Sequence, residues 1–186
     1  MDVNHPAHGS PNDPSSEFGK FAQAVQIINA NNPNVYTEPT SNWMTDLPPD
    51  KLCFIPYNGA YGREQLVWLE RELQQVQHEN QRAIIAAHVP LDKRCSSRST
   101  VAWDASDVLN ILHKYASHII ICLYGHFHKG GYCVDEYGLH HYTPPAPIEC
   151  ETDTAAFAHL DIYPDRLDVC GVGVLRSFSI PLHRPL

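Results

Sequence analysis

Long apolar runs and a secretion signal are both missing from this 186-residue sequence. No apolar stretch approaches the roughly 18 residues that a membrane-spanning helix requires. The first six residues, Met1 to Pro6, contain neither the basic region nor the apolar core of a signal peptide. We therefore expect a cytoplasmic protein that does not use a membrane.

Positive charge is also scarce. The sequence has 13 Lys and Arg against 21 Asp and Glu, which gives a net charge of -8 with neutral histidines. Because affinity for nucleic acids comes mainly from clustered cations that contact phosphates, we expect no nucleic-acid partner. An anionic small molecule is not excluded, since a bound pair of divalent cations reverses the local sign of the charge.

Cysteines with the C-x-x-C spacing of redox or metal motifs are missing too. The six cysteines are scattered along the sequence. In a chain without a secretion signal, such cysteines are more often reduced thiols than a disulfide framework. We expect several of them to be buried in strands.

Apolar periodicity and turn residues divide the sequence into a tail and one domain. Residues 1–16 are rich in Pro, Asn and Ser without periodicity, which predicts a loop or a disordered segment. Residues 17–186 alternate helical and strand patterns, which favours a layered α/β fold, and the prolines between 33 and 58 exclude long regular elements there. Helices are predicted over 17–30, over 63–77 and from Asp104 onward, and strands over 83–87, 118–124, 132–134, 139–142, 157–163 and 166–172.

Histidines follow two of the predicted strands. Strand 118–124 runs into Gly125, His126, Phe127 and His128, and strand 83–87 runs into His88. In a chain with twelve histidines the His-x-His spacing alone is weak, but glycines on both sides allow the tight backbone turn of a ligand loop. If the two strands are parallel neighbours, all three imidazoles meet at the same sheet edge. We therefore predict a metal site there.

Three segments carry a resemblance to a known family: residues 125–132 (GHFHKGGY), 87–90 (AHVP) and 58–69 (NGAYGREQLVWL). They resemble the last motifs of the calcineurin-like metallophosphoesterases, in particular the manganese-dependent ADP-ribose/CDP-alcohol diphosphatases. The resemblance runs in the same order from about Phe18 to Val172. It implies the C-terminal half of a metallophosphoesterase β-sandwich flanked by helices. It also implies Mn²⁺-dependent hydrolysis of ADP-ribose, CDP-choline or CDP-glycerol to a nucleoside monophosphate and a phosphorylated alcohol or sugar.

The sequence departs from this family where the family supplies carboxylates. The Asp-x-His, Gly-Asp-x-x-Asp and Gly-Asn-His motifs of its first half do not occur, so we expect the chain to start just past them. A bridging aspartate normally offsets the repulsion between two cations, and Mn²⁺ prefers carboxylate ligands. We expect the three histidines alone to bind at most one softer ion such as Zn²⁺, weakly, and to leave the isolated chain inactive.

The resemblance also assigns roles to single residues. His88 and His126 would bind one metal ion, and His128 the other. Further predictions place Asn58 and Gly59 on a phosphate or ribose, Trp103 on the base and Tyr132 along the pocket. A helix-entry turn at Asn58 and core packing of Trp103 are the competing interpretations.

Several polar pairs are assigned no chemistry. Asp104 and Asp107 are explained by capping of the helix that they open. His140 and His141 are adjacent on a predicted strand, so their side chains point to opposite faces and do not chelate together.

Two main interpretations of the whole chain remain, besides a calcineurin-like phosphodiesterase or phosphomonoesterase of a different substrate class. In the first it is part of an enzyme that acts on a nucleotide diphosphate. In the second it is a catalytically inactive truncated paralogue that binds a nucleotide or another protein. In either case, unpaired sheet edges predict self-association.

Overall fold

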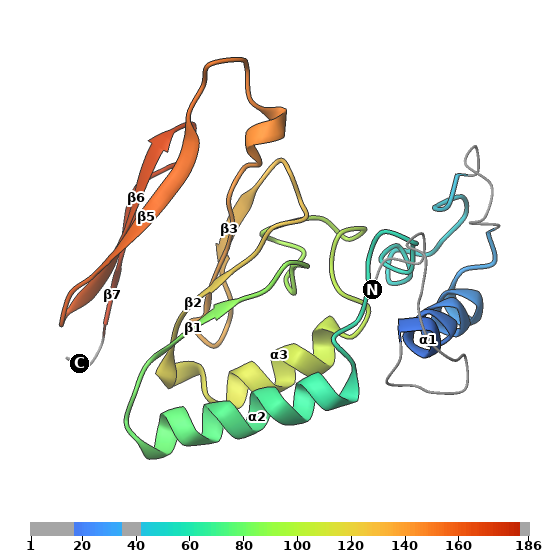
Figure 1. The fold of residues 1–186 in the computed structure, drawn as a ribbon, viewed down its shortest axis with the longest axis horizontal. Helices are drawn as coiled ribbons and strands as arrows, with labels where there is room; N and C mark the ends of the chain where they lie inside the picture. Colours follow the sequence, from blue (N-terminus) through green and yellow to red (C-terminus); the bar gives the residue numbers. More distant parts are fainter. Residues whose placement is uncertain (1–16, 35–41, 183–186) are drawn as a thin grey trace.

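The computed structural model describes residues 17–34 and 42–182 (Figure 1). The loop predicted over 1–16 lies outside the described residues. Helix α1 (Glu17–Asn31) confirms the first predicted helix and lies at the end of the molecule opposite strands β5 to β7. Between 42 and 61 the described chain forms turns without a helix or strand, as the prolines predict.

A mixed four-stranded sheet is the frame of the site. Its order is β1-β2-β4-β3, in which β1, β2 and β4 are parallel and β3 is antiparallel to β4. Residues Ile119 to Cys122 of β2 are buried, because this central strand is covered on both faces. The bounds are β1 Ala83–Ala86, β2 Ile119–Leu123, β3 Gly131–Val134 and β4 His140–Thr143.

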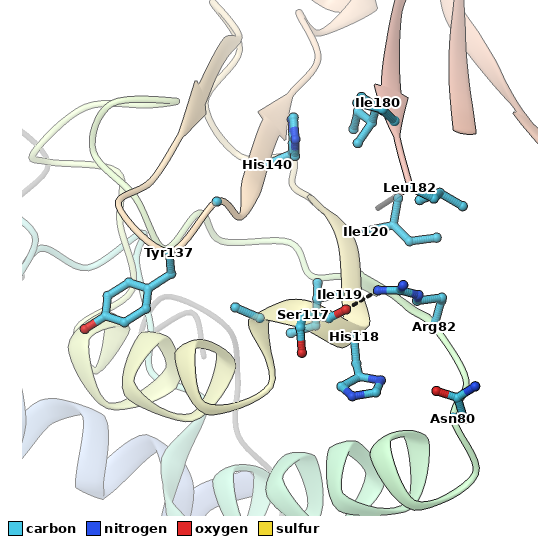
Figure 2. A pocket seen from close by; sticks show the side chains of 13 residues that line it. Asn80, Arg82, Ser117, His118, Ile119, Ile120, Tyr137, His140, Ile180 and Leu182 are labelled. Carbon is cyan, nitrogen blue, oxygen red and sulfur yellow. Dashed lines mark hydrogen bonds between the residues drawn. The ribbon is translucent and has the colours of Figure 1, made fainter. Parts of the chain in front are cut away.

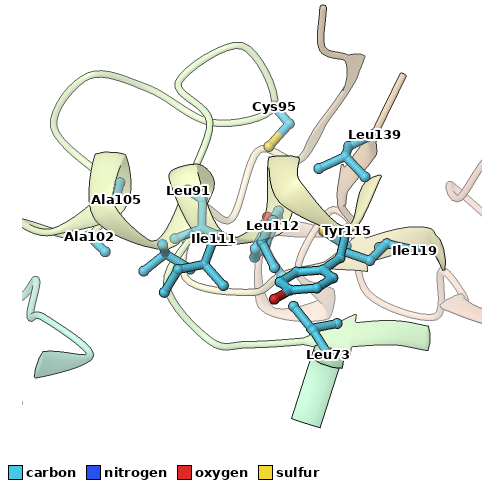
Figure 3. Packing of buried hydrophobic residues seen from close by; sticks show 13 residues of the cluster. Leu73, Leu91, Cys95, Ala102, Ala105, Ile111, Leu112, Tyr115, Ile119 and Leu139 are labelled. Atoms are coloured by element: carbon cyan, nitrogen blue, oxygen red, sulfur yellow. The ribbon is translucent and has the colours of Figure 1, made fainter. Parts of the chain in front are cut away.

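Helices α2 (Gly62–His78) and α3 (Ala105–Lys114) cover one face of this sheet (Figure 1). The apolar stripe predicted for the first of them brings Leu73 into contact with the side chains that α3 turns inward (Figure 3). Leu73 and Leu112 are almost fully buried. Truncation of such a side chain to alanine costs about 2–5 kcal/mol, so this cluster holds the helices on the sheet.

The predicted capping role of Asp104 is wrong in one respect. Asp104 occupies the position before α3, but its carboxylate makes no hydrogen bond to that helix. It accepts hydrogen bonds from the backbone N–H groups of Tyr61 and Gly62, at 3.1 and 2.8 Å. The orphan N–H groups at the start of α2 attract the carboxylate across the fold, so Asp104 ties the starts of the two helices together.

The second sheet is an antiparallel meander of β5 (Ala156–Ile162), β6 (Arg166–Gly173) and β7 (Phe178–Pro181). The β5–β6 and β3–β4 hairpins confirm the prediction, whereas β7 was not predicted because four residues ending in proline give too short a pattern. The inner face of this second sheet packs on the first sheet, so two sheets and a helical layer are stacked. The buried members of this contact are Ile120, Ile121, Tyr142, Leu167, Val169 and Ile180.

Three further features of the described residues concern the sheet edge, membranes and the cysteines. Among the described residues, β1 pairs with β2 alone, which leaves its other edge open. No helix within 17–34 and 42–182 combines the length and the apolar character needed to cross a membrane. All six cysteines are free thiols, as predicted; Cys53, Cys95 and Cys122 are buried, but of these three only Cys122 lies in a strand, because the other two are in loops.

Candidate metal centre

The parallel pairing of β1 and β2 places His88 beside the loop that carries His126. The backbone ladder continues past the strand ends, because Ala87 N–H donates to Leu123 O and Gly125 N–H donates to His88 O at 2.9 Å. The rings of His88 and His126 are 5.3 Å apart between centroids and meet edge to face. The two strands are therefore parallel neighbours, as the predicted metal site requires.

The loop backbone is unusual at His126. This residue has a φ of 62°, a left-handed conformation that costs a non-glycine residue about 1–2 kcal/mol. Gly125 lies close to His88, since an added Cβ would lie 3.1 Å from His88 Nδ1, a tight contact. Gly130, with a φ of 70°, packs its Cα against Pro145, where a Cβ would come within 2.7 Å. Strain of this kind persists where the surrounding structure fixes it, which is common at functional sites.

Asn58 fixes the orientation and the tautomer of His126. The amide nitrogen of Asn58 donates to the carbonyls of Cys53 and Ser99, both at 2.7 Å, so its Oδ1 is the acceptor that faces the ring. His126 Nε2 lies 2.7 Å from that oxygen and must therefore carry the proton. Its Nδ1 is left with a lone pair, which is the arrangement of a metal-binding imidazole held by a second group.

Glu149 has the same relation to His128. Its Oε1 lies 3.0 Å from His128 Nδ1, so Nδ1–H donates to the carboxylate and Nε2 is left as the ligand atom. Both side chains are exposed. Sequence reasoning missed Glu149, because it lies 21 residues further along the chain with no motif to connect it to the loop.

The electrostatic surroundings keep His126 neutral. Burial is the main cause that lowers its pKa, and the neighbouring His88 and His128 lower it further. A metal ion binds the neutral imidazole, so protons compete less at His126 than at an exposed histidine.

The donor set fits a divalent ion, but it does not form a three-histidine cage. Within the described part of the chain, the ligand atoms of His88, His126 and His128 are not all within 4.8 Å of one another. This spacing is compatible with two ions, one at His88 and His126 and one at His128. Carboxylates are what Mn²⁺ prefers, and Glu149 is the one that the described residues place against these imidazoles.

A cavity of about 480 Å³ opens beside the loop. His126 and His128 form one side of it, and apolar side chains of the second sheet, among them Leu160 and Val169, form the other. Its volume is within the usual range for small-molecule sites. The cavity is thus largely apolar and borders the two imidazoles of the loop.

The other predicted substrate residues are placed elsewhere. The Trp103 indole N–H donates to Cys53 O at 2.7 Å, its ring stacks on Phe54, and its backbone N–H donates to Gly59 O at 2.9 Å. Tyr132 bonds His140 through its hydroxyl at 2.6 Å. These contacts tie Trp103 and Gly59 into packing, and a substrate role for either, or for Tyr132, stays a prediction.

A second cavity lies at the opposite end of the first sheet (Figure 2). It has a volume of about 430 Å³ and is lined by Arg82, His118 and His140 together with Ile180 and Leu182. The Arg82 guanidinium donates to the Ser117 carbonyl. Because parallel strands present their ligand loops at the carboxyl end, this cavity is separate from the metal centre.

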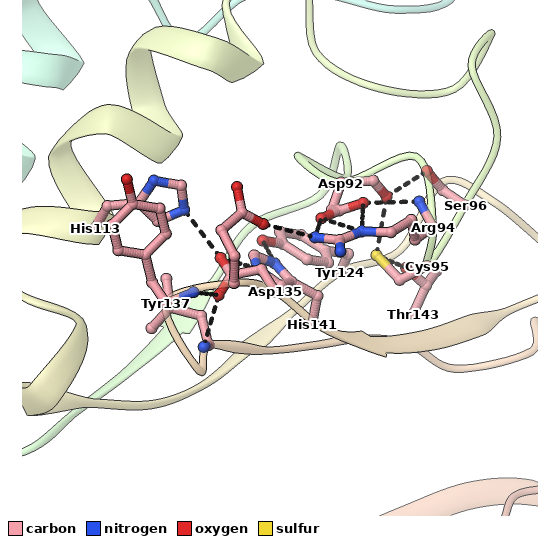
Figure 4. A network of polar contacts seen from close by, with 12 residues as sticks. Asp92, Arg94, Cys95, Ser96, His113, Tyr124, Asp135, Tyr137, His141 and Thr143 are labelled. Carbon is pink, nitrogen blue, oxygen red and sulfur yellow. Dashed lines mark hydrogen bonds and ion pairs between the residues drawn. The ribbon is translucent and has the colours of Figure 1, made fainter.

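A buried polar network supports the strand that leads into the loop (Figure 4). Tyr124, which directly precedes Gly125, bonds His141 Nδ1 through its hydroxyl at 2.9 Å. His141 Nε2 and His113 Nε2 donate to Asp135 at 3.2 and 2.9 Å. The predicted separation of the adjacent histidines is confirmed, since His140 instead contacts Tyr132.

The fold matches one half of a two-metal enzyme. A crystal structure of a dimetal phosphatase from Danio rerio superposes with a TM-score of 0.77 and 25% identity, over 92% of this chain and 52% of that one. Fold and site together therefore define the class: the chain has the fold of a dimetal phosphatase over about half of that enzyme's length. No protein-family model matches the chain.

Sequence relatives identify the family within this class. The chain is 38% identical over 154 residues to the manganese-dependent ADP-ribose/CDP-alcohol diphosphatase of Arabidopsis thaliana. It is 36% identical to that of Oryza sativa and 32% identical to that of Bos taurus. These matches include 81–83% of this chain but 44–48% of the relatives. The chain is a homologue of these diphosphatases and spans about half of their length.

Proposed function

We propose that this chain forms the histidine-bearing part of a Mn²⁺-dependent hydrolase for nucleoside diphosphate-linked substrates. ADP-ribose, CDP-choline and CDP-glycerol are the candidates, with a nucleoside monophosphate and a phosphorylated sugar or alcohol as products. The observation that carries the proposal is the pairing of His88 and His126 at 5.3 Å, at the ends of two parallel strands. Homology to diphosphatases named for these substrates supports the choice of substrate.

The residues of this chain divide the work as follows. His88 and His126 hold one ion and His128 holds the other, while Asn58 and Glu149 orient the rings. Two ions bound in this way would polarise the phosphoryl oxygens and supply a hydroxide nucleophile. The apolar cavity beside the loop excludes water from the nucleoside and positions the diphosphate at the imidazoles.

The open edge of β1 offers a place for the carboxylates. β1 ends two residues before His88, so a strand added to that edge would end beside the imidazole. Such a strand can come from another segment or from a second copy of the chain. Self-association through this edge predicts that the apparent mass in size-exclusion chromatography rises with concentration.

Fusion to a carboxylate-bearing half tests the function. The chain would be joined to the amino-terminal half of the Arabidopsis relative, and hydrolysis of ADP-ribose and CDP-choline would be measured with Mn²⁺. We expect activity in the fusion, none in the isolated chain, and a loss of activity in the fusion with His126→Ala. Hydrolysis by the isolated chain at the rate of the fusion would show that the missing carboxylates are not needed.

Binding without hydrolysis is the second candidate function. The observation that favours it is the cavity next to imidazoles that have a single carboxylate neighbour among the described residues. Calorimetric titration of the isolated chain with ADP-ribose, without added metal, separates the two functions. Tight binding of the nucleotide to the metal-free chain would favour a binding module.

A further inference from the structure

A second group of potential metal ligands lies on the antiparallel sheet. His159 and Asp161 are two residues apart on β5, and Cys170 on β6 is the cross-strand partner of His159. Side chains at i and i+2, and at directly paired positions, share one face of a sheet. The register therefore brings an imidazole, a carboxylate and a thiol together on a rigid scaffold.

This group is separate from the histidine loop. Leu167 and Val169, which alternate with Cys170 along β6, are buried in the contact with the first sheet. Cys170 consequently faces the other side, where the His159 and Asp161 side chains are largely exposed. The cavity beside His126 is lined from the inner face by Leu160 and Val169. A ligand on the outer face would thus not compete with the substrate site.

The distances suit one tetrahedral ion. The three candidate ligand atoms lie within 4.8 Å of one another. Asp161 Oδ2 is 3.5 Å from His159 Nε2 and 3.6 Å from Cys170 Sγ. Zinc bonds of about 2.0–2.3 Å to N, O and S place the ligands of a tetrahedron roughly 3.3–3.8 Å apart. We propose that His159, Asp161 and Cys170 form a Zn²⁺ site with one coordination position left to solvent.

The donor set selects zinc over manganese. Thiolate and imidazole suit Zn²⁺, whereas Mn²⁺ prefers carboxylate and water. This outer site therefore differs in metal preference from the enzyme centre proposed above, and it does not depend on that function. Two carboxylates strengthen the local attraction for a cation: Asp161 within the group and Asp168 paired opposite it, although Arg166 bonds Asp168.

Zinc binding includes a proton balance. Without metal, the Cys170 thiol donates a hydrogen bond to Asp161. An ordinary thiol, with a pKa of about 8.5, is mostly protonated at neutral pH. When Zn²⁺ binds, the S–H bond breaks, the proton goes to solvent and the thiolate forms a bond to the metal. Affinity is accordingly expected to rise with pH.

A titration with Co²⁺ tests thiolate ligation directly. Co²⁺ is a spectroscopic substitute for Zn²⁺, and a cysteine ligand adds a sulfur-to-metal charge-transfer band in the near ultraviolet. We expect this band in the wild-type chain and in the control Cys133→Ser, which removes another half-buried thiol. We expect no band in Cys170→Ser. Absence of the band in the wild type, or its persistence in Cys170→Ser, would overturn the proposal.

Zn²⁺ affinity, measured by competition with a chromogenic chelator, gives an independent test. His159→Gln changes an exposed side chain, so folding is expected to persist even if Cys170→Ser does not fold. We expect His159→Gln to weaken one Zn²⁺ site by more than about 10-fold, because it removes a ligand. His88→Ala combined with His126→Ala should leave the outer site intact. Unchanged Zn²⁺ affinity in His159→Gln would refute the site.

Discussion

Histidines are used in two opposite ways in two regions of this molecule. In the buried network beneath β4, both ring nitrogens of His141 are engaged, one by Tyr124 and the other by Asp135. In the loop after β2, one nitrogen of His126 is engaged by Asn58, and within the described residues the other makes no hydrogen bond. A fully bonded imidazole holds the fold together, whereas a half-bonded one presents a lone pair.

Residue type therefore does not separate structural from ligand histidines in a chain with twelve of them. For His141 and His126 the engaged nitrogens do, together with the second group that fixes each ring. If this distinction is right, mutations in the buried network should change stability, and mutations in the loop should change metal binding. The following predictions test that division.

Asp135→Ala should have the largest effect, on stability. Asp135 accepts hydrogen bonds from His113, His141 and two backbone N–H groups, and its removal leaves buried donors without an acceptor. We expect the free energy of unfolding in urea to fall by about 3 kcal/mol. Glu136→Ala, at the exposed next position, is the control and should cost about 0.5 kcal/mol or less. An equal loss in both variants would show that the network contributes little.

His126→Ala should produce the largest effect on activity. In the fusion with a carboxylate-bearing half, we expect Mn²⁺-dependent hydrolysis to fall by more than about 100-fold, with little change in stability. His118→Ala, at the other end of the sheet, is the matched control and should retain activity. Loss of stability with retained hydrolysis in His126→Ala would place His126 with the structural histidines.

Asn58 shares a property with each of the two regions. Its side chain is buried, as in the polar network, and it bonds His126 of the loop. Asn58→Ala should weaken metal binding by about 10–100-fold, since His126 loses the group that fixes its tautomer. Asn58→Asp keeps an acceptor for Nε2–H but loses the donors to Cys53 and Ser99. It should restore metal affinity while remaining less stable than the wild type. Failure of Asn58→Asp to restore affinity would argue against the orienting role.

The sequence predicted the layers and the loop better than it predicted the hydrogen-bond partners of single side chains. The stripe of α2, the buried β2 and the two hairpins follow from periodicity, and parallel strands explain why His88 meets His126. Asn58 bonds His126, 68 residues away, a contact that the sequence did not predict. Asp104 bonds the start of another helix. Such contacts depend on tertiary approach, which no local pattern encodes.

The polar network around Asp135 should also affect how the free energy of unfolding depends on pH. Burial raises the pKa of Asp135, but hydrogen bonds from the Leu139 amide, His141 and His113 outweigh it and lower the pKa below that of an ordinary carboxyl. A lowered folded-state pKa means a stabilising contribution that is present above the unfolded value of about 4 and is lost as pH falls through the folded value. The difference in unfolding free energy between wild type and Asp135→Asn should therefore shrink with decreasing pH. A constant difference would contradict this cause.

Of these mutations, Glu149→Gln should have the smallest effect on metal affinity. Glu149 orients His128 as Asn58 orients His126, but both partners are exposed, with 50% and 58% of their side chains accessible. Water screens such a pair, so its coupling is worth about 1 kcal/mol or less, which corresponds to less than about 5-fold in metal affinity. Glutamine keeps an acceptor oxygen for His128 Nδ1–H, so part of the orienting effect of residue 149 should remain. Isothermal titration with the metal measures the change in affinity. A loss as large as that of Asn58→Ala would show that Glu149 binds a metal ion itself and that the chain supplies a carboxylate to the centre.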